Sequence, residues 1–126
     1  EPFRPFAPAV LAEASETYFD LPDPDRQMAA RFMSLVVPVK DDQQAVIPAV
    51  NHMGTARIQT VHQEYNPRYY RLIHGFGQAT GVPVLLNTSF NVRGEPIVNT
   101  PKDSLRTFAT SGIDTLVMGS YILDKD

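Results

Sequence analysis

Residues 82–98 read V-P-V-L-L-N-T-S-F-N-V-R-G-E-P-I-V, an apolar run that ends in a cluster of small polar side chains. The run from Val82 to Leu86 is short and continuous, which is typical of a strand that is covered on both faces. It stops at Asn87, and Gly94 and Pro96 then turn the chain away. Because ligands in open α/β sheets bind beyond the carboxyl ends of strands, the stretch predicts a binding site directly after a core strand.

The polar cluster after this strand suits a small polar ligand. Hydroxyl and amide groups come from Asn87, Thr88, Ser89 and Asn91. Arg93 adds a planar guanidinium that matches a carboxylate or a phosphate. The pattern alone leaves open a second interpretation, in which the cluster is a turn whose side chains bond only their own backbone.

Around this stretch, hydrophobic periodicity and capping signals predict interleaved helices and strands. Helices are expected over residues 9–19, from a cap at Asn66 to Gly81, and from a cap at Thr100 to Gly112. Strands are expected over residues 32–39, 56–62, 82–86, 115–118 and 121–123, the first of them near a sheet edge or a bulge because of Pro38. Phe3 and Phe6 are expected to anchor an extended N-terminal segment. This order predicts an α/β (α+β) fold.

The second predicted helix has a clear apolar stripe. Its members are Tyr69, Leu72, Ile73 and Phe76, which recur at helical spacing and are expected to face the core. In the third predicted helix, Leu105, Phe108 and Ala109 are expected to do the same.

Composition limits the possible functions. The chain has 126 residues, which predicts a single domain, and 43% hydrophobic with 20% charged residues is ordinary for a globular fold. A net charge of −3 argues against a nucleic-acid surface. The absence of cysteine excludes disulfides, thiolate nucleophiles and cysteine-ligated metals. No apolar run reaches the ~18 residues of a membrane span and no signal peptide is recognisable, so we expect a cytoplasmic protein without a membrane partner.

Three arginines are candidates for binding an anion, because they lie in loops or at strand ends rather than on helix faces. They are Arg4, Arg57 and Arg93. His52, two residues before Gly54 in a loop, is a candidate ligand contact. No histidine pair has metal-ligand spacing, so no metal-ligating residue is predicted, and neither Gly-rich nucleotide motif is present.

Three blocks of this sequence resemble the C-terminal part of the NodU/CmcH-type O-carbamoyltransferases. They are F-R-P-F-A-P (3–8), G-T-A-R-I-Q-T-V (54–61) and the long block at 81–98, and the resemblance extends over essentially the whole chain. It implies that residues 1–126 form one YrdC-like module, a twisted open mixed sheet with helices packed on it and a positively charged cavity.

The resemblance also implies an activity. Relatives of this kind bind carbamoyl phosphate and ATP, with Mg²⁺ accompanying ATP, and form carbamoyl-adenylate. An N-terminal Kae1-like domain of the same parent chain, which holds its own metal, then transfers the carbamoyl group to an acceptor hydroxyl. The expected function is therefore that of the carbamoyl-phosphate- and ATP-binding module of an O-carbamoyltransferase.

Matching motifs assign roles to individual residues. The resemblance implies catalytic roles for Arg57, Ser89 and Asn91, and substrate-binding roles for Arg4, His52, Asn87, Thr88 and Arg93. The three guanidinium groups are expected to converge beside the serine–asparagine pair. The K-x-R signature of such sites lies upstream of the F-R-P-F-A-P block, so we expect the chain to be a fragment that is incomplete by itself. Two alternatives stay open: a non-catalytic nucleotide- or RNA-binding YrdC-like module, and a structural fragment that is inert without its partner domain.

Overall fold

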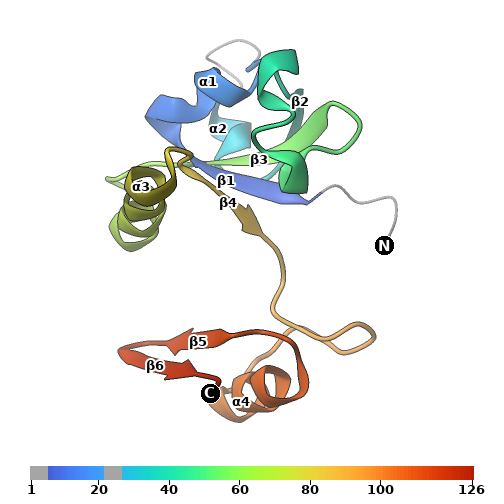
Figure 1. Ribbon diagram of the computed structural model, residues 1–126, viewed down its shortest axis with the longest axis vertical. Helices are drawn as coiled ribbons and strands as arrows, with labels where there is room; N and C mark the ends of the chain where they lie inside the picture. Colours follow the sequence, from blue (N-terminus) through green and yellow to red (C-terminus); the bar gives the residue numbers. More distant parts are fainter. Residues whose placement is uncertain (1–5, 22–26) are drawn as a thin grey trace. The chain divides into compact units, whose positions relative to one another are not determined.

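A four-stranded mixed sheet organises the first of two units into which the chain divides, residues 1–88 and 89–126 (Figure 1). The computed structural model describes residues 6–21 and 27–126. Its elements confirm the predicted mixed α/β class. Within the described ranges, no helix has the length and apolar character needed to cross a membrane.

The sheet of the first unit has the strand order β2-β3-β1-β4. Its strands are β1 (Ala7–Leu11), β2 (Leu35–Pro38), β3 (Thr55–Val61) and β4 (Val84–Asn87). β1 runs parallel to β3 and antiparallel to β4, while β2 pairs antiparallel with β3. β2 is an edge strand, as its proline predicted. β4 is the other edge, and Leu86 is 42% exposed, so the prediction that this strand is covered on both faces is wrong.

At the centre of the sheet, the structure contradicts one prediction. Residues 9–19 have helical periodicity, yet residues 7–11 form the buried strand β1, followed by the short 3₁₀ helix η1 (Ala12–Ala14) and the single-turn helix α1 (Ser15–Tyr18). Strand β1 forms ladders with a neighbour on each side. These non-local ladders outweigh the local helical pattern, because strand formation depends on cross-strand packing more than on intrinsic preference.

Apolar side chains pack on both faces of this sheet. On one face, Val10, Val37 and Ile58 join residues from α1, α2 (Gln27–Ala30) and η4 (Pro48–Val50) in the larger cluster. On the other face, Ala9, Leu11 and Val61 pack against Ile73 of α3 (Pro67–Thr80). A further short helix, η3 (Asp41–Gln43), lies in the connection from β2 to β3.

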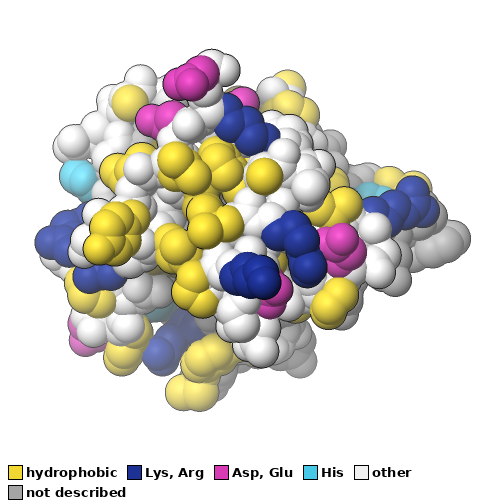
Figure 2. All heavy atoms as spheres, turned by 90° about the horizontal axis from the view of Figure 1, so that it is seen from below, with side chains coloured by type: hydrophobic (Ala, Val, Ile, Leu, Met, Phe, Trp, Pro, Cys, Tyr) yellow, Lys and Arg dark blue, Asp and Glu magenta, His cyan; other side chains and the backbone are white. Residues whose placement is uncertain are grey.

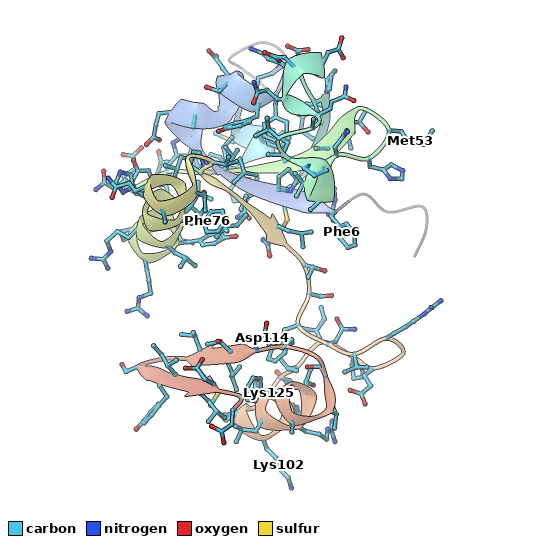
Figure 3. The ribbon with its side chains drawn as sticks, in the orientation of Figure 1. Phe6, Met53, Phe76, Lys102, Asp114 and Lys125 are labelled. Atoms are coloured by element: carbon cyan, nitrogen blue, oxygen red, sulfur yellow. The ribbon has the colours of Figure 1, made fainter. Side chains whose placement is uncertain are left out.

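Helix α3 begins and ends where the sequence predicts. The Asn66 side chain accepts a hydrogen bond from the Tyr69 amide at 3.3 Å, and Gly81 ends the helix at a φ of 81°. The predicted buried stripe is only partly right. Ile73 is fully buried, but Leu72 is 60% exposed and Phe76 is 41% exposed. Figure 3 labels Phe76 on this helix.

The predicted N-terminal anchoring is not observed for Phe6. This side chain is 56% exposed just before β1 (Figure 3). Phe3 lies outside the described residues.

The second unit contains helix α4 (Pro101–Thr110) and a hairpin of β5 (Thr115–Met118) and β6 (Tyr121–Asp124). The Thr100 hydroxyl accepts from the Asp103 amide at 3.1 Å, which confirms the predicted cap. Phe108 is buried, whereas Leu105 and Ala109 are exposed, so only the first of these three predicted core residues is confirmed.

Lys125 ties the end of the hairpin to the helix. Its Nζ lies 4.9 Å from the centroid of the Phe108 ring and donates to the carbonyl of Ser111, and its amide donates to the Asp114 carbonyl at 2.9 Å (Figure 3). The hairpin nevertheless leaves Val117, Tyr121 and Ile122 exposed. Figure 2 shows hydrophobic side chains gathered across the face that it views, beside Lys and Arg side chains.

Candidate functional site

The pairing of the strands brings three of the polar side chains onto one face of the sheet in the first unit. Ala9 pairs with Gln59 of β3, and Ala7 pairs with Asn87 of β4. If the parallel β1–β3 register is continued by two residues toward the start of both strands, Arg57 lies beside Ala7. Because residues two apart on a strand share a face, Arg57, Gln59 and Asn87 stand on the same face, with the two alanines between them.

Two side-chain amides meet above the central strand. Asn87 Nδ2 donates a hydrogen bond to Gln59 Oε1 at 2.9 Å, although β1 separates the strands that carry them. The small side chains of Ala7 and Ala9 leave the space for this contact. Asn87 Nδ2 also lies 3.9 Å from Met33 Sδ. The two amides therefore form a fixed polar pair on an otherwise apolar floor.

Arg57 brings a positive charge to the same face. Its Nε atom is buried and has no hydrogen-bond partner among the residues that the structure describes. An unpaired buried donor costs about 1–3 kcal/mol, so a ligand oxygen at this atom would be favourable. The rest of the guanidinium can hold a phosphate or carboxylate through two parallel hydrogen bonds. Ala56, Ile58 and Thr60 are buried on the opposite face of β3.

The polar group lies at one end of its sheet face. Helix α3 packs against Leu11 and Val61, which are at the other end of β1 and β3 from Ala7 and Arg57. Arg57, Gln59 and Asn87 are each only partly buried. We define these three residues as the polar row.

His52 lies in the tight turn that leads into β3. Its backbone amide and carbonyl pair with those of Thr55 at 2.8 and 3.0 Å. Between them, Met53 and Gly54 both have positive φ, 52° and 81°, as in the two-residue hairpin turns that match strand twist. Met53 points away from the sheet (Figure 3). His52 is partly buried, and its predicted contact with substrate stays a prediction.

In the second unit, Ser89 and Asn91 contact each other. The Ser89 hydroxyl donates to Asn91 Oδ1 at 2.6 Å. Asn91 Nδ2 in turn donates to the carbonyls of Glu95 at 2.9 Å and Val92 at 3.2 Å. The Asn91 amide thus holds the loop closed behind Ser89, whose own side chain is exposed.

The remaining predicted site residues are less constrained. Arg93 is exposed beside Gly94, which has a φ of 86°, and Thr88 is exposed after β4. Arg4 lies outside the described residues. Arg57 belongs to the first unit and Arg93 to the second. The expected convergence of Arg4, Arg57 and Arg93 beside the serine–asparagine pair stays a prediction.

Gln59 was not among the residues predicted from the sequence. Two signals could have found it: its place in the block at 54–61, and its position two residues after Arg57 on a strand, which puts it on the same face. In the described part of the chain, no three His, Asp or Glu side chains gather closely enough to hold a metal ion.

Comparison with known proteins adds a family to this geometry. The family model described as "Carbamoyltransferase C-terminus" matches residues 1–125. Nodulation protein NolNO of Sinorhizobium fredii is 47% identical over 99% of this chain and 18% of its own length. Nodulation protein NolO of Bradyrhizobium diazoefficiens is 44% identical, with coverage of 99% and 23%. The 3'-hydroxymethylcephem-O-carbamoyltransferase of Amycolatopsis lactamdurans is 34% identical, with coverage of 94% and 22%. The chain therefore spans about a fifth of the length of these relatives.

Proposed function

Because the chain belongs to the carbamoyltransferase C-terminus family, we propose that it is the carbamoyl-phosphate- and ATP-binding module of an O-carbamoyltransferase. The module forms carbamoyl-adenylate and releases phosphate and pyrophosphate. The net reaction also consumes one water molecule. An N-terminal Kae1-like domain of the parent chain then passes the carbamoyl group to an acceptor hydroxyl. We further propose a cytoplasmic setting.

The observation that carries this proposal is the partly buried Arg57, whose Nε lacks a partner among the described residues, next to two fixed amides. Both substrates carry phosphate, and each repels the other. A guanidinium neutralises that charge, and preorganised donors stabilise the charge that develops during transfer.

Mg²⁺ fits this arrangement as an ion carried by ATP. The described residues offer no cluster of carboxylates or histidines for a metal. Mg²⁺ commonly keeps several waters and binds through substrate phosphates. When bound, it would neutralise the ATP phosphates, while the arginines and amides of the chain position the reacting groups.

Ser89 and Asn91 are proposed to orient the carbamoyl unit. Asn91 is held by two backbone carbonyls and accepts from Ser89, so its orientation is fixed before any substrate binds. Such preorganisation is what positioning of a small reactant requires.

The test is carbamoyl-phosphate-dependent release of pyrophosphate from ATP by the full-length protein. We expect Arg57→Ala and Ser89→Ala to lower kcat/KM, the former by about 10–100-fold because a charged hydrogen bond contributes roughly 1.5–3 kcal/mol. Arg71→Ala is the matched control, since Arg71 is exposed on α3. Unchanged rates in both site variants would remove the site assignment. ATP binding without any pyrophosphate release would instead favour the non-catalytic nucleotide-binding module.

A further inference from the structure

The orientation of the Asn87 amide can be deduced from its neighbours. A thioether sulfur accepts hydrogen bonds but cannot donate them. Met33 Sδ therefore requires the NH₂ end of Asn87 on its side, and Nδ2 is the atom found there, 3.9 Å away. The same NH₂ group donates to Gln59 Oε1 at 2.9 Å. A flipped Asn87 would set two acceptors against each other at Met33.

This orientation leaves only one kind of contact for a ligand. Asn87 Nδ2 carries two hydrogens and has two acceptors within reach, Gln59 Oε1 and Met33 Sδ. No described residue donates to Asn87 Oδ1. Asn87 can therefore offer a ligand a hydrogen-bond acceptor and nothing else.

The other two members of the polar row offer the opposite chemistry. A guanidinium only donates, so Arg57 can bind only acceptor atoms. Gln59 uses its Oε1 to accept from Asn87, which leaves its Nε2 as a donor. The row thus presents donors at β3 and an acceptor at β4.

Carbamoyl phosphate has the complementary pattern. Its phosphate oxygens accept hydrogen bonds, and its carbamoyl NH₂ group donates them. Adjacent strands lie about 4.8 Å apart, so the backbones of β3 and β4 stand roughly 10 Å apart across β1. A ligand of a few heavy atoms can bridge side chains that reach inward from both strands above Ala7.

We propose that Asn87 is a specificity-determining residue, which selects the carbamoyl group by accepting a hydrogen bond from its nitrogen, and that Gln59 is the positioning residue that holds Asn87 in this orientation. The inference rests on the proposed function, and it adds how the site distinguishes a carbamoyl group from another acyl group of the same shape.

Acetyl phosphate provides the discriminating probe, because a methyl group replaces the NH₂ group while the phosphate is retained. The measurement is the ratio of the dissociation constants of the full-length protein for acetyl phosphate and carbamoyl phosphate. We expect a wild-type ratio well above one, by about 5–100-fold, since an unsatisfied polar contact costs roughly 1–3 kcal/mol. In Asn87→Ala and Gln59→Ala the ratio should fall toward one.

Gln59→Glu is the conservative rescue. A carboxylate oxygen still accepts from Asn87 Nδ2, so the ratio should stay close to the wild-type value. The added negative charge weakens binding of both phosphates alike and cancels from the ratio. Gln78→Ala, at an exposed position on α3, serves as the control for loss of a glutamine and should leave the ratio unchanged.

The outcomes separate the inference from the proposed function. A wild-type ratio that persists in Gln59→Ala would overturn the positioning role, and one that persists in Asn87→Ala would overturn the specificity role. A protein that binds neither phosphate would overturn the proposed function and this inference with it. The inference is supported if the ratio falls toward one in both alanine variants and is restored in Gln59→Glu. A merely structural role for Gln59 would instead change both affinities without changing their ratio.

Discussion

The side chains of Gln59 on β3 and Asn87 on β4 are joined by a 2.9 Å hydrogen bond that spans the intervening strand β1. The contact exists because β1 presents alanine at both positions beneath it. Side chains in a sheet normally contact those of the adjacent strand. Here the small alanines of β1 leave space, so Asn87 of the edge strand β4 contacts Gln59 of β3 on the far side of β1.

The volume of the side chain at Ala7 should control this contact. We expect Ala7→Leu to fill the space above β1, separate Gln59 from Asn87 and lower the preference for carbamoyl over acetyl phosphate. Overpacking of this buried site should also destabilise the chain by about 1–3 kcal/mol. Ala7→Gly removes volume instead, so it should retain the preference despite some loss of stability. A preserved preference in Ala7→Leu, measured by ligand titration, would contradict this account of the contact.

The two residues with positive φ in the turn before β3 should affect the stability of the chain. Met53 has a φ of 52°, a conformation that costs a side chain such as methionine roughly 1–2 kcal/mol and that asparagine tolerates better. Met53→Asn should therefore stabilise the chain by about 0.5–1 kcal/mol in urea unfolding, since Asn-Gly is the preferred pair in such turns. The matched change Gly54→Ala, at a φ of 81°, should destabilise it. Shifts of the same sign in both variants would argue against the assigned turn.

The cap of α3 should contribute measurably to stability. The Asn66 side chain accepts from the Tyr69 amide, so Asn66→Ala leaves that amide without its partner. We expect a loss of about 1 kcal/mol in the free energy of unfolding. Asn66→Asp should retain most of it, because a carboxylate also accepts and favours the helix N-terminus. The idea fails if the alanine and aspartate variants unfold at the same urea concentration.

Stability should decline in strongly alkaline solution, in part through Tyr70. Its hydroxyl donates a hydrogen bond to the Glu13 carboxylate, which raises the pKa of Tyr70 above 10.0, and burial adds to the shift. Since the folded-state pKa exceeds the unfolded one, the stabilisation is complete below the unfolded pKa and disappears as pH rises through the folded pKa.

Tyr70→Phe should therefore make the loss of stability above about pH 10 less steep. Burial also raises the pKa of Tyr18 and Tyr69, so part of the alkaline loss should remain. Urea midpoints between about pH 8 and pH 11.5 measure the slope. A slope equal to that of the wild type would show that the contact with Glu13 does not persist in solution.

Local signals were sufficient for helices α3 and α4 and for the last hairpin. Asn66, Gly81 and Thr100 cap or end their helices through contacts a few residues away, so the sequence contains the whole interaction. Strand β1 could not be predicted in this way, because its partners lie about fifty and about seventy-five residues further along the chain. The local pattern of residues 9–19 describes a helix that these pairings prevent.

The same distinction between local and non-local contacts applies to the candidate site. Arg57 could be predicted because a guanidinium on a strand after a tight turn is unusual by itself. The contact between Gln59 and Asn87 could not, because the two amides are 28 residues apart and meet only through the sheet. The packing of α3 shows the same effect, since the sheet buries Ile73 and leaves Leu72 exposed.

The outer strands of the two sheets differ in how they resist aggregation. Pro38 ends β2 without a backbone N–H group, which discourages a further strand from extending that ladder. All four residues of β6 are exposed, and among the described strands β6 pairs only with β5. Its outer main-chain groups, flanked by Tyr121, Ile122 and Leu123, form a template for another chain. At high concentration, intermolecular association of this chain should begin at β6, and a lysine in place of Ile122 should delay it.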